Sequence, residues 1–240
     1  MLKPVEKKSL SDAVFEQLRD EIVSGRMEPG TTLPAERALC DMLNVNRGAV
    51  REALKKLEQA RLVSIQHGGA TRVLDFRETA GLDLIATLVT DAGGKLDAEV
   101  LRGVMELRSA MGADIARRCA ARDPERGGVL RAIAEKMNAH KGDLVGLLEL
   151  NIAFWDELVN GSKNVAYRLA YNSVRATLSE LGAVFGSILA DEITDADTHT
   201  RIARAVAAGA VDDAEFYARD LLSRGEARIH KIADVIEERT

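Results

Sequence analysis

The segment from residue 34 to residue 74 constrains the fold most, because its apolar periodicity changes twice within a short distance. "PAERALCDML" and "RGAVREALKKLEQA" carry apolar residues at helical spacing, and "NVN" interrupts the pattern between them. Two β-like runs follow, "LVSIQ" and "TRVL", joined by "HGGA". Two helices joined by a tight turn and followed by a hairpin have the order of a winged helix-turn-helix. We therefore predict this fold for residues 1–75.

The second helical pattern of this segment divides its residues between two faces. Asn46 is placed to cap the helix, and Gly48 and Ala49 keep its first turn slim enough for main-chain N–H groups to approach a phosphate. Its apolar residues recur at i, i+4 and i+7 and would face a core, whereas its basic residues recur every four positions on another side. The apolar set is Val50, Leu54 and Leu57, and the basic set is Arg47, Arg51 and Lys55.

The two preceding helices are predicted from similar patterns. Ser9 is the expected cap of "SLSDAVFEQLRDEIVSG", and Pro34 suits the first turn of "PAERALCDML". The stripe expected to face the core is Leu10, Val14, Leu18 and Ile22 in the first, and Ala38, Leu39, Met42 and Leu43 in the second.

The basic residues of this segment lie in a chain that is acidic overall. The net charge is −5, yet residues 33–72 hold 7 Lys and Arg against 4 Asp and Glu. Such a bias fits a small basic face on a non-basic protein, while a charged helix face by itself is usually only solvated. The preceding helix with Arg37, the capped turn and the glycine hairpin favour nucleic-acid binding over plain solvation.

The remaining chain gives one helical pattern after another, without a convincing strand. We expect residues 76–95 to form a linker and connecting helix, and residues 96–240 to form an antiparallel bundle of six or seven helices. The predicted fold class is therefore mainly α. The clearest apolar stripes are Val104, Leu107, Met111 and Ile115; Val174, Leu178, Leu181, Phe185 and Ile188; and Ile229, Ile232 and Ile236.

The compartment follows from two negative observations. No apolar run approaches the length of a membrane span, and "MLKPVEKKSL" lacks the apolar core of a signal peptide, so we expect a cytoplasmic protein. Cys40 and Cys119 lie far apart inside helical patterns, and we expect reduced core residues rather than a disulfide or a zinc site.

The sequence shows no catalytic motif. The patterns G-x-x-x-x-G-K-[ST], H-E-x-x-H and G-x-S-x-G do not occur, and no G-x-G-x-x-G follows a strand. The histidines are scattered, without a recognisable relation to a cysteine or serine: His67, His140, His199 and His230. We therefore expect a binding protein rather than an enzyme, with no cofactor.

The segment "LPAERALCDMLNVNRGAVREALKKLEQARLVSIQHGGATRV" closely resembles the DNA-binding domain of GntR-family transcription regulators. The resemblance is strongest to the fatty-acid-responsive FadR type, and it continues more weakly through "LELNIAFWDELVNGSKN" and the C-terminal helices. It implies that Arg37, Arg47 and Arg51 contact phosphates and guanine edges, and that His67 and Gly68 form a wing tip in the adjacent minor groove. The guanidinium fork fits the O6/N7 edge of guanine.

Two departures from the FadR type concern the identity of the operator sequence rather than DNA binding itself. Gly48 and Ala49 stand where FadR-type proteins carry hydroxyl residues, and Gly69 replaces a basic wing residue. The residues expected at the DNA are Arg37, Asn46, Arg47, Gly48, Ala49, Arg51, His67, Gly68 and Gly69.

The resemblance further implies that the bundle dimerises and binds a small effector. In the larger FCD group, an Asp-x3-His pair and two later histidines hold a metal that binds a carboxylate effector. The positions that match the pair and the first later histidine carry Asn151, Trp155 and His199, and the last falls near Leu221 or Leu222. Because one ligand of four remains, we expect no metal.

The loss of metal ligands recurs in the FadR type, whose effector is a long-chain acyl-CoA. Trp155 suits a cavity for an acyl chain, and Asn151, Phe185 and His199 are further pocket candidates. Arg108 faces the interior and has two interpretations of equal weight, an anion-binding residue or an ion pair with a carboxylate across the bundle.

These inferences combine into an expected function. We expect a homodimeric transcription regulator of fatty-acid metabolism that binds a palindromic operator in double-stranded DNA and is released by long-chain acyl-CoA. Two alternatives remain open. One is an FCD-type regulator of carbon metabolism that senses a small carboxylate through a metal site, and the other is a constitutive DNA-binding protein whose bundle only dimerises.

Overall fold

The chain divides into two compact units, residues 1–95 and residues 96–240. The computed structural model describes residues 9–66, 70–90, 96–140 and 142–237. Each unit has a hydrophobic core of its own. Most residues of segments 76–90, 96–140 and 142–237 are helical, so the fold is mainly α, as predicted.

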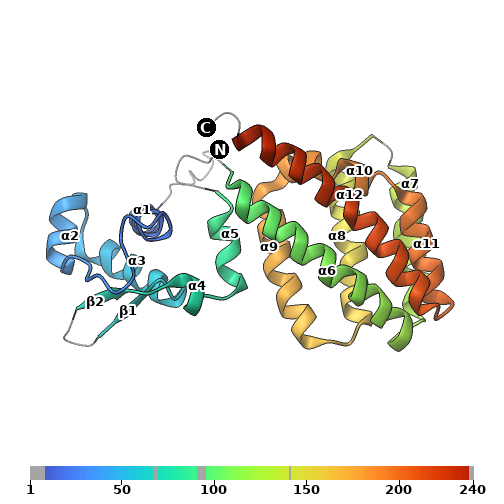
Figure 1. Cartoon of the computed structure of the whole chain (residues 1–240), viewed down its shortest axis with the longest axis horizontal. Coiled ribbons are helices and arrows are strands. Elements are labelled where there is room, and N and C mark those ends of the chain that lie inside the picture. The colour runs from blue at the N-terminus through green and yellow to red at the C-terminus, as the bar shows by residue number, and fades with distance from the viewer. Residues whose placement is uncertain (1–8, 67–69, 91–95, 141, 238–240) are drawn as a thin grey trace, which may run out of the picture. The chain divides into compact units, whose positions relative to one another are not determined.

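The first unit is a winged helix-turn-helix (Figure 1). The two strands pair antiparallel, with Val63 opposite Val73. The chain before the second helix adds to this hairpin, because the Gly30 main-chain N–H donates to Val73 O at 2.8 Å and that of Leu33 donates to Thr71 O at 2.8 Å. The elements are α1 (Leu10–Val23), α2 (Glu36–Leu43), α3 (Arg47–Gln59), β1 (Val63–Ile65) and β2 (Thr71–Val73).

The helix ends follow the sequence closely, with one correction. Ser9 caps α1 by accepting from the Asp12 main-chain N–H, and Asn46 caps α3. Between α2 and α3, Asn44 adopts the left-handed conformation, with φ of 51°, which lets the chain turn sharply. Pro34 lies outside α2, which begins at Glu36, so its expected place in the first turn was wrong.

The core of the first unit contains Val14, Leu18 and Ile22 of α1 and the predicted apolar face of α3. Three residues expected in this core are exposed instead: Leu10, Ala38 and Met42, with Met42 70% exposed. Leu10 is the first residue of α1, and the eight-residue α2 presents only a narrow face to the core. The prediction from helical spacing therefore overestimated how many apolar residues a short helix buries.

Residues 76–90, expected as a linker and connecting helix, pack as part of the first unit. Leu84 is buried in its core, and Phe76 and Leu88 pack against it. The Thr79 hydroxyl donates to Arg61 O at 3.0 Å, which ties this segment to the end of α3. It contains α4 (Phe76–Thr79), a 3-10 turn η1 (Leu82–Leu84) and α5 (Ile85–Leu88).

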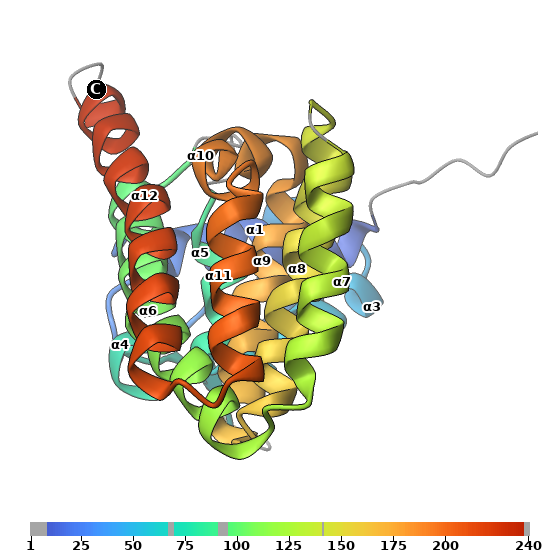
Figure 2. The same ribbon diagram turned by 90° about the vertical axis from the view of Figure 1, so that its right-hand side faces the viewer.

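The second unit is a helical bundle, in which α12 lies along α6 (Figure 2). The two run antiparallel, since Gly112 faces Leu222 while Gly225 faces Met105. None of the described helices is long and apolar enough to cross a membrane. The helices are α6 (Ala98–Arg122), α7 (Arg126–Ala139), α8 (Leu144–Gly161), α9 (Val165–Ile188), the one-turn α10 (Ala190–Ile193), α11 (Ala196–Ala207) and α12 (Val211–Glu237).

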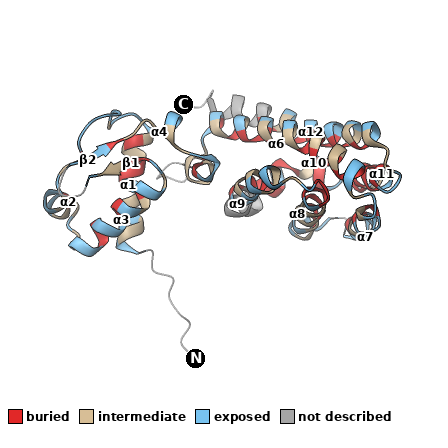
Figure 3. Ribbon diagram, turned by 90° about the horizontal axis from the view of Figure 1, so that it is seen from below, coloured by how far each residue is buried: buried red, intermediate tan, exposed pale blue. Residues whose placement is uncertain are grey.

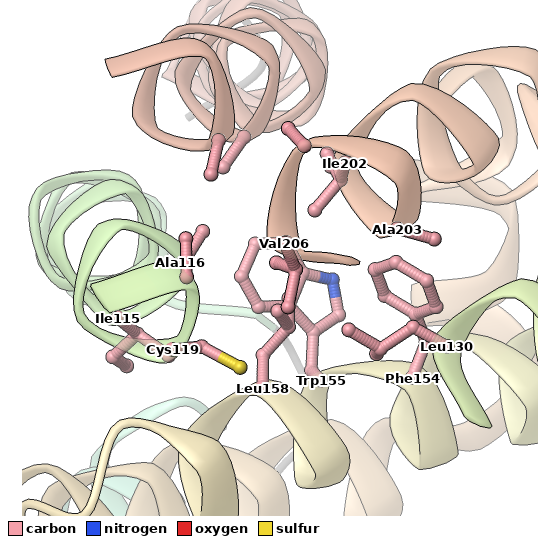
Figure 4. Close-up of a cluster of buried hydrophobic side chains, with 14 of the residues drawn as sticks. Ile115, Ala116, Cys119, Leu130, Phe154, Trp155, Leu158, Ile202, Ala203 and Val206 are labelled. Carbon is pink, nitrogen blue, oxygen red and sulfur yellow. The ribbon is translucent and has the colours of Figure 1, made fainter. Parts of the chain in front are cut away.

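Buried residues lie on the helix faces that are turned toward neighbouring helices (Figure 3). Phe154 and Trp155 project from α8 toward Ile202 and Ala203 of α11 (Figure 4). Cys119 is also buried here, and burial raises the pKa of its thiol to about 12. This cysteine is therefore protonated and unreactive at neutral pH, whereas Cys40 is only half-buried.

A close helix contact in this bundle gives a stability prediction with an internal control. A Cβ at Gly127 of α7 would lie 2.6 Å from both Cα and N of Ala207 in α11. Gly127→Ala is expected to destabilise the second unit by about 1–3 kcal/mol, because main chain cannot move aside as a side-chain tip can. Urea unfolding followed by the fluorescence of Trp155, the single tryptophan, measures this unit.

The neighbouring glycine provides the control. A Cβ at Gly128 would have no atom within 4 Å. Gly128→Ala is therefore expected to keep or raise stability, by at most about 1 kcal/mol, through helix propensity. If both variants lose the same free energy of unfolding, the close contact between α7 and α11 is not the cause of the destabilisation.

Candidate DNA interface and effector pocket

The exposed face of α3 presents two arginines that share one carboxylate. Arg47 and Arg51 are 68% and 55% exposed, and each donates from Nε to Oε2 of Glu36, at 2.9 and 3.0 Å. The hydrogen bond from Arg47 is the main cause that lowers the pKa of Glu36. Glu36 therefore stays ionised and holds the two guanidinium groups side by side on a solvent-facing surface.

The first turn of α3 offers fewer free main-chain donors than the sequence indicates. Asn46 Oδ1 accepts from the Ala49 main-chain N–H at 2.9 Å, and Ala49 is buried. Its N–H is thus already hydrogen-bonded within the protein. The expected contacts of Gly48 and Ala49 with a phosphate stay predictions. Arg37 and Gly48 are exposed. The wing-tip candidates His67, Gly68 and Gly69 lie outside the described residues.

The second unit contains a pocket that opens to solvent, and the space in and over it that no atom fills is about 430 Å³. Of the residues expected to bind an effector, Arg108, Asn151 and Trp155 line it, whereas Phe185 and His199 are buried but do not. The other lining residues were not selected from the sequence, because no motif distinguishes them from ordinary core residues of a helix. The described lining residues are Arg108, Met111, Gly112, Ile115, Asn151, Ile152, Trp155, Tyr171, Val174 and Leu222.

The polar residues of this pocket are bound to a buried glutamate that the sequence reasoning missed. Arg108 donates to both carboxylate oxygens of Glu192 in α10, from Nη1 to Oε2 at 2.8 Å and from Nη2 to Oε1. Asn151 Nδ2 donates to the same Oε1 at 3.3 Å. The Glu192 side chain has no exposure to solvent. Of the two interpretations of Arg108, the structure shows the ion pair across the bundle.

Two further residues hold this arrangement. His199 Nε2 lies 3.0 Å from Asn151 Oδ1, and burial lowers the pKa of His199, which favours the neutral ring at pH 7. On the other side, Gly225 of α12 leaves room for the carboxylate, because a Cβ there would lie 3.3 Å from Glu192 Oε2 and 2.9 Å from Met105 Cε.

These residues do not fit the metal site of the FCD group. His199 and Asn151 do meet in space, but the Asn151 amide is bound to Glu192. At the other two positions stand Trp155 and either Leu221 or Leu222, and Trp155 and Leu222 lie against Gly112. An indole and an aliphatic side chain supply no lone pair to a zinc or nickel ion.

Comparison with protein families assigns both units. Residues 10–73 match the bacterial regulatory proteins of the gntR family, and residues 103–224 match the FCD domain. The chain belongs to the GntR family. The GntR helix-turn-helix binds DNA and the FCD domain binds an effector, so this GntR protein is a transcription regulator and not an enzyme.

Relatives at the level of sequence extend over most of this GntR regulator. It is 34% identical over 222 residues to the HTH-type transcriptional regulator Mce2R of Mycobacterium tuberculosis, covering 92% of each chain. It is 30% identical over 181 residues to the fatty acid metabolism regulator protein of Escherichia coli, covering 73% of this chain and 72% of that protein.

A solved structure supports the fold alone. Lar, which controls the expression of the Listeria monocytogenes agr system, is 15% identical to this GntR regulator. It covers 95% of this chain and 99% of its own, with a TM-score of 0.59.

The carboxylate shared by Arg47 and Arg51 gives a testable prediction about DNA selectivity. Glu36→Gln in this GntR regulator removes a negative charge beside the two arginines. Its affinity for a short duplex of unrelated sequence is expected to rise about twofold to fivefold at low salt. Fluorescence anisotropy with a labelled duplex measures the change.

The control is Glu21→Gln, which removes the carboxylate that Arg26 contacts elsewhere in the first unit. This variant is expected to bind the unrelated duplex with nearly native affinity. Weaker binding by the Glu36→Gln protein would contradict the idea that Glu36 restrains the arginines in the free regulator.

Proposed function

We propose that this GntR protein is a homodimeric regulator of fatty-acid metabolism that binds a palindromic operator and is released by long-chain acyl-CoA. The pocket carries this proposal. It lies between α6, α8, α9 and α12, and the space between helices of a bundle is a common place for small-molecule sites. Most of its lining is apolar, as suits an alkyl chain. Its polar groups are Arg108 and Asn151, which are bonded to Glu192, the Tyr171 hydroxyl, which donates to Ile152 O, and the Trp155 indole N–H.

Two further observations support the choice of ligand. Trp155 and Leu222 fill the positions of metal ligands with apolar surface, which favours a chain over a small acid. Relatives named as fatty acid metabolism regulators share about a third of their aligned residues with this chain. The dimer is proposed because each helix-turn-helix then reads one half-site, which makes the operator palindromic.

The effector is tested by the dependence of binding on chain length. Acyl-CoAs from octanoyl to stearoyl are titrated into the full chain, and stabilisation is followed by thermal unfolding. Affinity is expected to rise about fourfold per buried methylene until the pocket is full. The same ligands are expected to release a genomic DNA fragment in a gel-shift assay. Affinities that do not depend on chain length would refute the proposed effector.

A pocket-filling variant locates the ligand. Ile152→Trp adds bulk to the pocket lining from a half-buried position on α8, so long-chain binding is expected to be lost while DNA binding remains. Leu169→Trp places the same side chain on the surface of α9, at a residue 63% exposed, and is expected to bind acyl-CoA normally. Normal acyl-CoA binding by the Ile152→Trp protein would place the ligand elsewhere.

A further inference from the structure

Arg108 lines the pocket, and its charge is already neutralised from inside the protein. Among the described lining residues, no other side chain is a cation or a carboxylate. Both oxygens of the Glu192 carboxylate accept from its guanidinium group, and a third hydrogen bond comes from Asn151. This bidentate geometry is the one a bound carboxylate ligand would adopt. Glu192 thus occupies the place where such a ligand would be recognised.

The position of Glu192 makes this arrangement hard to displace. The side chain is fully buried, on a one-turn helix that packs against α8, α9 and α12. A ligand carboxylate at Arg108 would leave the Glu192 charge in the core without its partner, and a buried unpaired charge is strongly unfavourable. A neutral ester or thioester carbonyl next to the intact pair imposes no such penalty.

We propose that Glu192 determines the specificity of this pocket, by excluding free carboxylates and admitting neutral acyl ligands. The proposal rests on the proposed function, since it concerns the same pocket and separates fatty acids from their esters. Trp155 supports it, because its ring lies 5.9 Å from the Arg108 guanidinium carbon and presents apolar surface next to the neutralised pair. The regulator would then respond to activated acyl groups and ignore the corresponding free acids.

The native protein provides the first test. Decanoate and methyl decanoate have the same alkyl chain and differ in charge, so they are titrated separately into the full chain by calorimetry. Methyl decanoate is expected to bind at least about tenfold more tightly than decanoate. Decanoate binding as tight as that of the ester would overturn the inference.

The second test reverses the preference. Glu192→Gln keeps an oxygen that accepts from Arg108 but removes the charge, so Arg108 becomes an unneutralised cation beside the pocket. Decanoate affinity is expected to rise at least about tenfold in this variant, with methyl decanoate affinity little changed. Unchanged decanoate affinity in a folded Glu192→Gln protein would overturn the inference.

A double variant separates charge from loosened packing. Arg108→Met with Glu192→Met removes both charges and leaves an apolar pocket, so no gain in decanoate affinity is expected. An equal gain in the double variant would overturn the inference. If the Glu192→Gln protein does not fold, the comparison of decanoate with methyl decanoate on the native chain still tests the inference.

The same measurements separate the two proposals. If long-chain acyl-CoA releases DNA while decanoate and its ester bind the native protein equally, only the specificity of Glu192 is refuted. If acyl-CoA, decanoate and the ester all fail to bind, the proposed function is refuted and the inference with it.

Discussion

Replacing Arg47 by alanine is expected to abolish sequence-specific operator binding and to leave the chain folded. Arg47 is exposed on α3 and contacts Glu36 alone among the hydrogen-bond partners described, so its loss removes no core packing. A bidentate arginine–guanine contact contributes about 1–3 kcal/mol, which corresponds to about 5- to 150-fold in affinity for each half-site. Operator fragments selected from random DNA by the native protein provide the probe for a gel-shift assay.

Arg26→Ala is the matched control. Arg26 is similarly exposed, at 60%, and is likewise paired with a glutamate of the same unit. Arg26→Ala removes the same charge as Arg47→Ala, so a general electrostatic effect on DNA affinity would be similar in the two variants. Specific affinity within about threefold of native in Arg47→Ala would contradict the assignment of this arginine to base recognition.

Replacing Arg108 by methionine is expected to cause the largest loss of stability in the second unit. Glu192 would remain fully buried without its cation, and breaking a buried ion pair on one side costs about 3–5 kcal/mol. The expected decrease in Tm is on the order of 10 °C for a unit of this size. Fluorescence of Trp155 reports the transition directly, because this ring lies next to Arg108.

The double variant with methionine at both positions is expected to recover most of this loss. Two apolar side chains of similar volume leave no charge without a partner in the core, and such replacements are often neutral. Calorimetry and urea unfolding of the native, single and double variants complete a double-mutant cycle. A double variant as unstable as Arg108→Met would show that the ion pair is not the source of the loss.

The fold of the first unit could be predicted from sequence because its signals are local. The caps at Ser9 and Asn46 and the apolar spacing of Val50 and Leu57 each depend on residues within a few positions. Local hydrogen bonds and helical period are sufficient to determine such elements. Met42 and Leu10 were wrongly predicted to be buried because the prediction used helical spacing alone. Helical spacing does not determine how much of a helix surface the neighbouring helices cover.

The pocket could be predicted only in part. Arg108, Asn151 and Trp155 were identified through resemblance, but their partner Glu192 was not. Glu192 lies in an acidic segment that looks like solvated surface, and it is 84 positions from Arg108 in the chain. Only the packing of α10 against α8 and α12 brings the pair together. That long-range contact decided between the two interpretations of Arg108.

Gly225 couples the packing of α12 to that of α10. A Cβ at this position would lie 3.3 Å from Glu192 Oε2 and 2.9 Å from Met105 Cε, so a larger residue requires these side chains to shift. Such a residue is expected to disturb the Glu192 carboxylate, and with it the neutralised arginine. Among related regulators, the residues at these two positions are therefore expected to change together, and to separate chains that sense acids from chains that sense neutral ligands.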